Sequence, residues 1–266
     1  MRAIAHIQAR EARNGPKTPR MRGCDMFAEH EYETRAIAHI MIVEGSTMKR
    51  IKSPLRAAKA LYSLVQLVRD PNRLGQVFEM ADALAEPEAL AELVGQIAAE
   101  SPAVDRALNE RHRFEIDLAA LRKPPEGTLG HVFAEIITAA GLDPDALPDL
   151  PSPDRSSYFR AHLYETHDVW HAVTGFGMDQ WGEIGLQAFY LAQIGGGLPS
   201  LLLAVGFLRV ALYEMDQGRH LMDGIVRGYD MGRRAKPFFG VHWDELWSVP
   251  LEEVRRRLGI AGIEVA

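Results

Sequence analysis

The sequence contains a single cysteine, Cys24, among its 266 residues. One thiol cannot form an internal disulfide, and it cannot supply the several thiolates that cage a structural zinc ion. The composition therefore fits a protein of a reducing compartment. It also leaves imidazole and carboxylate groups as the ligands of any metal site.

An excess of positive charge is also absent, since 30 Lys and Arg residues face 36 Asp and Glu residues, for a net charge of −6. Proteins that bind DNA or RNA in general need a basic face to displace counterions. Nucleic acid is thus not an expected partner. The contents of hydrophobic residues, 47%, and of charged residues, 25%, are ordinary for a soluble globular protein and exclude a collagen-like or wholly disordered chain.

Strand signals are missing too, because no run alternates apolar and polar residues between hairpin turns. Helix starts are frequent: Ser53-Pro54, Glu86-Pro87, Ser101-Pro102 and Thr128. Apolar residues also recur at helical spacing, first at Ala58, Leu61, Tyr62, Val65 and Val68. We predict an all-α fold with a single multi-helix domain over residues 49–266.

The first 48 residues differ from the rest. Six cations face one acid in the first 22 residues, and no apolar run there is long enough for a secretory signal. The hexapeptide RAIAHI occurs at 2–7 and 35–40, but two copies do not make a repeat fold. We predict that residues 1–48 are a poorly ordered arm that precedes the domain.

The 25 residues from Ile184 to Leu208 carry no charge. That length could span a bilayer, but the segment from Gly195 to Ser200 divides it into halves that are too short. We predict two apolar helices, buried in the core or lining a tunnel for a long hydrophobic ligand. A further helix is expected to continue from Arg209 through residues 216–232. The cations of residues 233–236 then complement its dipole, or they contact an anion or a membrane surface.

His167 and His171 are four residues apart, a spacing that places both imidazoles on one helix face. This arrangement is typical of a helix-borne site for a divalent metal. Asp168, next to the first histidine, could be a third ligand, an orienting group or a base. Gly175 ends this helix, Asp179 can cap the next, and Glu183 on its first turns can return to the histidine pair.

Imidazole and carboxylate ligands suit Zn, Fe(II), Mn or Co, and two histidines with one carboxylate also match the facial triad of non-haem iron oxygenases. The dipeptide His167-Asp168 allows comparison with metal-dependent phosphohydrolases. That alternative would need His112 or His131 together with Asp216, Asp223 or Asp230, whose placement the sequence does not determine.

The order His167-Asp168, His171 and Glu183 resembles the signature of the coenzyme Q biosynthesis protein 4 family. Three further segments are similar to that family: SPLRAAKALYSLVQLVRDP, LRKPPEGTLGHVFAEI and WDELWSVPLEEVRRRLGI. The resemblance covers residues 52–260, which is nearly everything but the arm.

The resemblance implies an all-α protein of ubiquinone biosynthesis that acts with other enzymes of that pathway, peripherally at its membrane. It implies that His167, Asp168, His171 and Glu183 are catalytic or metal-ligating residues for a divalent ion, zinc first, with iron or manganese as alternatives. The implied ligand is a polyprenylated hydroxybenzoate, and the implied reaction is oxidative decarboxylation at ring C1, in which hydroxyl replaces carboxyl.

Two further functions stay open at this stage. One is a lipid-binding scaffold without chemistry that organises the biosynthetic complex, and the other is a phosphohydrolase. The chain looks like a bacterial relative, so we expect a cytoplasmic protein at the inner membrane, and we allow for a homodimer.

Overall fold

The computed structural model describes residues 53–71, 73–84, 86–142 and 150–260. The predicted arm and Cys24 lie outside these ranges. The helices are α3 (Pro54–Arg69), α4 (Leu74–Leu84), α5 (Pro87–Glu100), α6 (Pro102–Glu110), α7 (Leu118–Leu121), α8 (Leu129–Ala140), α9 (Arg155–Thr174), α10 (Gln180–Ile194), α11 (Gly197–Tyr213), α12 (Gly218–Arg234) and α13 (Leu251–Leu258). Two short 3₁₀ helices, η2 (Met215–Gln217) and η3 (Trp243–Leu246), complete the described elements.

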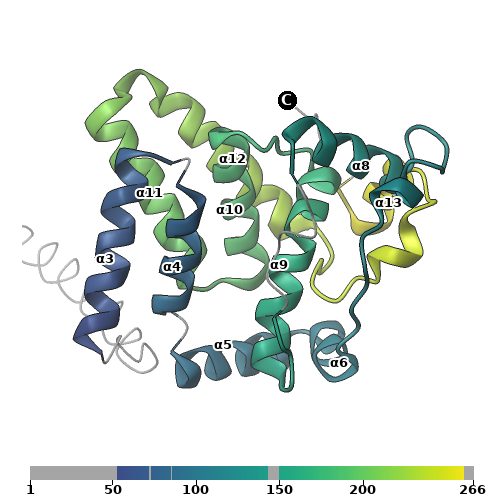
Figure 1. The fold of residues 1–266 in the computed structure, drawn as a ribbon, viewed down its shortest axis with the longest axis horizontal. Coiled ribbons are helices and arrows are strands. Elements are labelled where there is room, and N and C mark those ends of the chain that lie inside the picture. Colours follow the sequence, from purple (N-terminus) through teal and green to yellow (C-terminus); the bar gives the residue numbers. More distant parts are fainter. Residues whose placement is uncertain (1–52, 72, 85, 143–149, 261–266) are drawn as a thin grey trace, which may run out of the picture. The chain divides into compact units, whose positions relative to one another are not determined.

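The described residues form no β-strand, and one isolated bridge joins Thr128 to Pro250. The all-α prediction is confirmed. In Figure 1, α9 and α10 lie near the centre of the described helices, α3 and α4 pack together on one side, and α8 and α13 lie on the other.

Local signals explain where several helices begin and end. The Ser53 and Ser101 hydroxyls accept the main-chain N–H of Arg56 and Val104, and a proline follows each of these serines at the first helical position. Gly141 ends α8 with a φ of 66°, a conformation that costs glycine little. The two helix starts agree with the sequence predictions.

The buried face of α3 differs from its most apolar stripe. Leu61 and Tyr62 are 63% and 59% exposed, whereas Leu67 and Ala60 are buried where α3 packs on α4 and α11. The spacing of apolar residues therefore identified the helix but not the side that faces the core, because contact with neighbouring helices decides that side.

The helix expected to continue from Arg209 through residues 216–232 is interrupted, so that prediction was wrong. Helix α11 ends at Tyr213, and α12 begins at Gly218. Glu214 lies at the break, where its carboxylate accepts hydrogen bonds from Arg209 (2.5 Å) and Gln180 (3.1 Å). These side-chain bonds, one to the last turns of α11 and one to α10, favour the turn over a continuous helix.

The main core surrounds the middle of α9. The indole of Trp170 is fully buried and stacks on Tyr190 of α10, with ring centroids 4.3 Å apart. Phe189 and Phe238 meet the same indole edge to face. Aromatic packing therefore holds α9 and α10 together just beside the predicted metal residues.

Helix α12 packs on α10 at glycines. A Cβ placed on Gly228 would lie 1.9 Å from the main-chain O of Gly185, and one on Gly232 would lie 2.8 Å from that of Phe189. Only the absence of a side chain allows the two backbones to approach this closely.

The two apolar helices expected from the uncharged segment are α10 and α11. Helix α10 is largely buried, as predicted, whereas α11 is buried on one side only, since Leu203 is 7% and Phe207 47% exposed. Within the described ranges, no helix is both long and apolar enough to cross a membrane.

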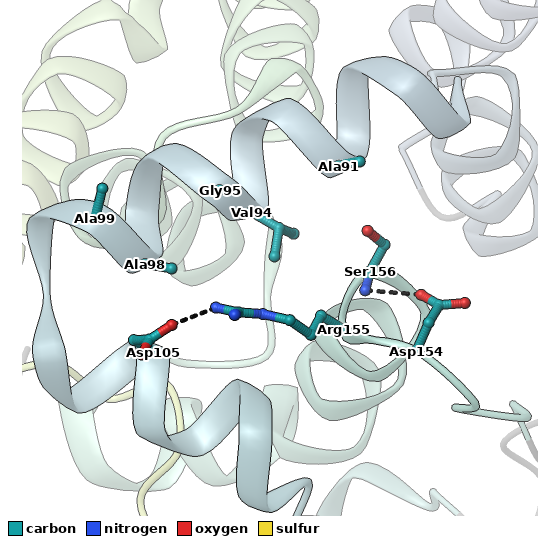
Figure 2. Close-up of a pocket in the computed structure, with 9 residues that line it drawn as sticks. All are labelled: Ala91, Val94, Gly95, Ala98, Ala99, Asp105, Asp154, Arg155 and Ser156. Atoms are coloured by element: carbon teal, nitrogen blue, oxygen red, sulfur yellow. Dashed lines mark hydrogen bonds and ion pairs between the residues drawn. The ribbon is translucent and has the colours of Figure 1, made fainter.

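A cavity of about 760 Å³ lies between α5, α6 and the start of α9 (Figure 2). Small side chains of α5 line one side, and the ion pair of Arg155 with Asp105 (2.5 Å) lies opposite. The lining residues are Ala91, Val94, Gly95, Ala98, Ala99, Asp105, Asp154, Arg155 and Ser156. None of them belongs to α10 or α11, so a lipid tunnel along those two helices stays a prediction.

Candidate metal centre

Both ends of helix α9, which carries the two histidines, are stabilised. The Asp154 carboxylate accepts the N–H groups of Ser156 and Ser157 at the first turn. At the other end, Arg255 of α13 donates to the main-chain O of Val173 at 2.9 Å. Because both ends are bonded, the helix presents its last two turns in a defined position.

The connection to α10 is tight. Gly175 ends α9 with a φ of 76°, and Asp179 caps α10 by accepting the N–H groups of Trp181 and Gly182. A Cβ on Gly182 would lie 1.8 Å from the main-chain O of Gly177, so the loop rests directly on the first turn of α10. Glu183 follows Gly182, and its position is set by that contact.

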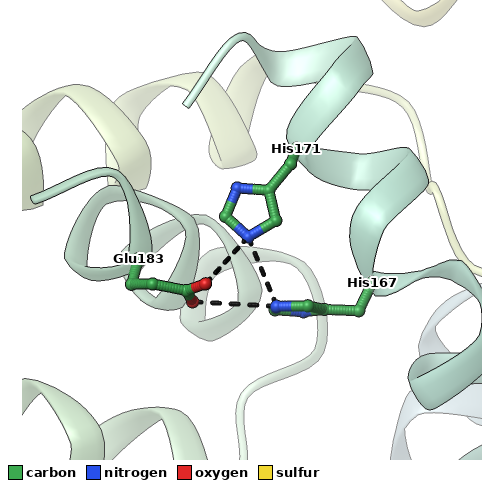
Figure 3. A group of neighbouring side chains, drawn as sticks. All are labelled: His167, His171 and Glu183. Atoms are coloured by element: carbon green, nitrogen blue, oxygen red, sulfur yellow. Dashed lines mark hydrogen bonds and ion pairs between the residues drawn. The ribbon is translucent and has the colours of Figure 1, made fainter. Parts of the chain in front are cut away.

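Three ligand-type side chains converge between α9 and α10 (Figure 3). The Nε2 of His171 lies 3.1 Å from a carboxylate oxygen of Glu183 and 3.3 Å from the Nε2 of His167. The second oxygen of Glu183 lies 3.7 Å from the Nε2 of His167. The predicted return of Glu183 to the histidine pair is thus confirmed.

The outer nitrogen of each imidazole has a partner that orients the ring. His171 Nδ1 lies 3.0 Å from the main-chain O of Phe176, which can only accept, so Nδ1 donates this hydrogen bond and, in the neutral ring, Nε2 is the nitrogen with the lone pair. His167 Nδ1 lies 3.4 Å from the hydroxyl of Tyr190, whose ring stacks on the imidazole. Such contacts beyond the ligands are typical of metal-binding histidines.

The charges of the cluster support one another. Burial opposes the charged forms of His167 and Glu183. Their hydrogen bonds and opposite charges nevertheless raise the pKa of His167 and lower the pKa of Glu183. His171 is 1% exposed, whereas the side chains of His167 and Glu183 are 31% and 40% exposed. The cluster therefore has a closed side and a side open to solvent.

The donor set fits a divalent cation. In its neutral form, His171 directs the Nε2 lone pair toward the carboxylate of Glu183 and the imidazole of His167. A positive ion among these three groups would be attracted to the carboxylate and to the imidazole lone pairs. Two imidazoles and one carboxylate suit Zn, Fe(II) or Mn.

Asp168 is not among the three side chains that converge. It is half-buried, and its charge contributes to raising the pKa of His167 and of Tyr190, so it lies near the cluster. Its role as a ligand, an orienting group or a base stays a prediction.

The histidines considered for a phosphohydrolase are engaged elsewhere. His112 lies 2.8 Å from Asp244 and stacks on His242. His131 lies 3.1 Å from the main-chain O of Pro124. Of the aspartates, Asp230 pairs with Arg234. Neither histidine nor any of the three aspartates joins the cluster of ligand-type residues.

Sequence reasoning missed the contribution of Tyr190. It lies seven residues after Glu183, which places both on one face of α10, and this spacing was a usable signal. The main-chain O of Phe176 and the guanidinium of Arg255 carried no comparable signal, because their contacts depend on a loop and on a distant helix.

Fold and site together define an all-helical protein with a cluster of two histidines and one carboxylate between consecutive helices. The family model of the coenzyme Q (ubiquinone) biosynthesis protein Coq4 matches residues 47–264. The chain belongs to this family, and it is a ubiquinone biosynthesis protein.

Relatives and a solved structure agree with this assignment. The chain is 29% identical over 213 residues to the mitochondrial ubiquinone biosynthesis protein COQ4 of Pyricularia oryzae, covering 77% of this chain and 68% of that protein. It is 29% identical over 210 residues to the corresponding protein of Yarrowia lipolytica, covering 77% and 79%. A crystal structure described as a candidate ubiquinone biosynthesis protein from Nostoc punctiforme superposes with a TM-score of 0.67 at 34% identity, covering 77% of this chain and 98% of that one.

Proposed function

We propose that the chain binds a divalent metal through His167, His171 and Glu183 and acts on a polyprenylated hydroxybenzoate in ubiquinone biosynthesis. The observation that carries this proposal is the convergence of the three ligand groups within 4.8 Å on a site with one solvent-open side. Zinc is the expected ion, and iron or manganese are the alternatives. When bound, such an ion would supply Lewis acidity at the ring substituent.

The proposed reaction is oxidative decarboxylation at ring C1. The bond from C1 to the carboxyl carbon breaks and carbon dioxide leaves, while a new bond from C1 to oxygen forms a phenol. The ring loses two electrons in this exchange, and we name dioxygen as the acceptor. With water as the oxygen source, the products are the phenol, carbon dioxide and hydrogen peroxide. Within this chain, the three ligand residues and Tyr190 would orient the head group on the solvent-open side of the cluster.

A set of exposed apolar side chains supports the polyprenyl part of the proposal. Of the large apolar side chains that are exposed among the described residues, all but Phe78 and Leu142 belong to α3, α11, η2 or α12. They are Leu55, Leu61, Tyr62, Val65, Phe207, Leu208, Leu212, Tyr213, Met215, Met222, Val226 and Tyr229. We call this set the apolar surface. Helix α11 contacts both α3 and α12, so the three helices are neighbours.

We infer that the apolar surface is where the protein meets the bilayer that holds its polyprenyl substrate. On α12, Met222, Val226 and Tyr229 share one face, and Arg233 continues it, which suits apolar contact beside anionic head groups. Flotation with vesicles of phosphatidylcholine and cardiolipin tests this contact. Val226→Asp should reduce flotation strongly, and Leu142→Asp, at another exposed apolar residue outside the apolar surface, should not. Equal flotation of both variants would refute the assignment.

Metal analysis and complementation test the central proposal. Purified protein should carry close to one equivalent of a single divalent metal, and His171→Ala should lose it and fail to convert the carboxylated precursor in a strain that lacks the endogenous gene. His131→Ala, on α8, controls for loss of a histidine. Native mass spectrometry of the same samples would report bound lipid and a homodimer if one forms.

A scaffold without chemistry is the second candidate, because family membership alone does not require catalysis. In that case His171→Ala would lose association with other ubiquinone biosynthesis enzymes, or lose stability, and no single chemical step would be blocked. A phosphohydrolase is disfavoured, since its additional histidines and aspartates do not join the cluster. Location at the membrane that carries the pathway follows from the same proposal.

A further inference from the structure

Arg227 of α12 carries a charge without an acidic partner. Its guanidinium lies over the ring of Phe176, 4.8 Å from the centroid, and its Nε is buried without a hydrogen-bond acceptor. Among the described residues, no carboxylate lies within 4.0 Å of this guanidinium, although Asp223 lies one turn earlier on the same helix. Arg234, at the end of α12, differs from Arg227, since it pairs with Asp230.

Burial of the Arg227 Nε without an acceptor is costly, because desolvation of its N–H group is not offset by a hydrogen bond. The contact with the phenyl face offsets only part of that cost. Unlike Nε, the two Nη groups of Arg227 are not among the buried atoms that lack a partner. They are therefore available to a ligand that enters from solvent. Unpaired and held in place, this group is suited to bind an anion.

Phe176 connects Arg227 to the metal centre. The main-chain O of Phe176 accepts the Nδ1–H of His171, while its ring holds the guanidinium of Arg227. The same ring rests on α10 at Gly185, where a Cβ would lie 2.4 Å from the phenyl edge. Gly185 and Glu183 both belong to α10. The phenyl ring of Phe176 therefore contacts α10 and Arg227, while its main-chain O binds His171.

Backbone packing makes this position of Arg227 a fixed one. Gly228, the next residue, contacts the main chain of Gly185. A Cβ placed on Gly224 would lie 3.6 Å from the main-chain O of Trp181. Because α12 cannot slide along α10 without a clash, Arg227 stays beside the first two turns of the helix that carries Glu183.

We propose that Arg227 recognises the ring carboxylate of the aromatic substrate. This inference rests on the proposed function, since it names the residue that distinguishes a carboxylated head group from its product. A planar guanidinium pairs with a planar carboxylate through two parallel hydrogen bonds, and a phenol lacks the second acceptor. Product, once its carboxylate is gone, would lose this contact and leave.

Binding of two short-chain probes tests the assignment: 3-prenyl-4-hydroxybenzoate and 2-prenylphenol, which differ by the carboxylate alone. Full-length protein should bind the carboxylated probe about tenfold more tightly, the strength expected of a charge-assisted hydrogen-bonded pair. Arg227→Met should bind both probes about equally, and Arg227→Lys should keep part of the preference. Arg219→Met, two turns earlier on α12, is the matched control and should behave as the unaltered protein.

Further arms separate this idea from other outcomes. Geranyl monophosphate serves as a phosphate probe, and if its binding depends on Arg227 while that of the carboxylated probe does not, the assignment is overturned. A carboxylate preference that survives in a folded Arg227→Met protein, or the absence of any preference in the unaltered protein, also overturns it. Titrations with and without chelator, together with metal content, show separately whether the metal proposal holds, because Arg227→Met should keep its metal.

Discussion

The Nδ1 of His171 lies 3.0 Å from the main-chain O of Phe176, five residues further along the chain. This hydrogen bond assigns the proton of the ring and leaves the opposite nitrogen to meet Glu183 at 3.1 Å. The loop that ends α9 therefore does more than connect two helices. It orients an imidazole whose own helix position would leave the ring free to rotate.

Glu183→Gln should abolish stoichiometric metal binding, because an amide oxygen carries no charge to balance the ion. Glu245→Gln, 71% exposed on η3, is the matched control and should keep its metal. Metal content after dialysis, read by inductively coupled plasma mass spectrometry, is the measurement. Full retention by Glu183→Gln would contradict a metal site at this cluster.

Asp168→Asn tests whether Asp168 is a metal ligand or acts from outside the ligand set, as an orienting group or a base. Since Asp168 does not lie within the group of converging ligand atoms, we expect the variant to retain its metal and to bind it somewhat more weakly. Competition with a chelator of known affinity gives the change. Complete loss of metal, equal to that of Glu183→Gln, would make Asp168 a ligand.

Tyr190→Phe should weaken metal affinity by about tenfold, the lower end for loss of a partner of a ligating histidine. The variant removes the hydroxyl that lies 3.4 Å from His167 Nδ1 but keeps the ring stacked on Trp170. Tyr229→Phe, exposed on α12, controls for loss of a hydroxyl. An affinity unchanged in Tyr190→Phe, with near-ultraviolet circular dichroism intact, would show that this hydroxyl does not orient His167.

Gly228→Ala and Gly95→Ala form a pair that tests the contact between α12 and α10. Both glycines lie inside helices, so each alanine gains up to about 1 kcal/mol of helix propensity. A Cβ meets nothing within 4 Å at Gly95 but lies 1.9 Å from Gly185 O at Gly228. We expect Gly95→Ala to raise the midpoint of urea unfolding and Gly228→Ala to lower the free energy of unfolding by about 2 kcal/mol or more. Equal shifts of the same sign would refute the close contact.

The stability of the protein should fall as the pH is lowered below about 6.5, in part through His162. Burial, together with the nearby His112 and His242, lowers the pKa of His162 to about 3 in the folded protein. Between pH 6.5 and 3 the unfolded chain therefore binds one more proton there, which favours unfolding as the pH falls. The contribution approaches about 1.4 kcal/mol for each pH unit.

Comparison with His162→Gln isolates this contribution from that of the carboxylates. The variant loses the acceptor of the Gly240 N–H, at 3.1 Å, and should be less stable at pH 7. Its free energy of unfolding should nevertheless depend less steeply on pH between 6.5 and 5, measured by urea unfolding. Parallel curves for the two proteins would show that His162 does not remain neutral in the fold.

Several features of the site were predictable from the sequence because they are local. The spacing of His167 and His171 places both rings on one helix face, and Asp179 marks the start of the helix that carries Glu183. Other features were not predictable. The exposed position of Leu61, the break at Glu214 and the unpaired charge of Arg227 each depend on which helices meet, and that is not written in the neighbouring residues.

The sequence by itself thus determined the all-helical class, many of the helix ends and the ligand types, because caps, periodicity and spacing act over a few residues. Tertiary structure alone decided how those ligands meet. The contact of Gly228 with the main chain of Gly185 sets the distance between α10 and α12. The stacking of Trp170 on Tyr190 sets the distance between α9 and α10. Close packing is a property of pairs of surfaces, so neither the orientation of the imidazoles nor the exposed apolar surface followed from one chain segment read alone.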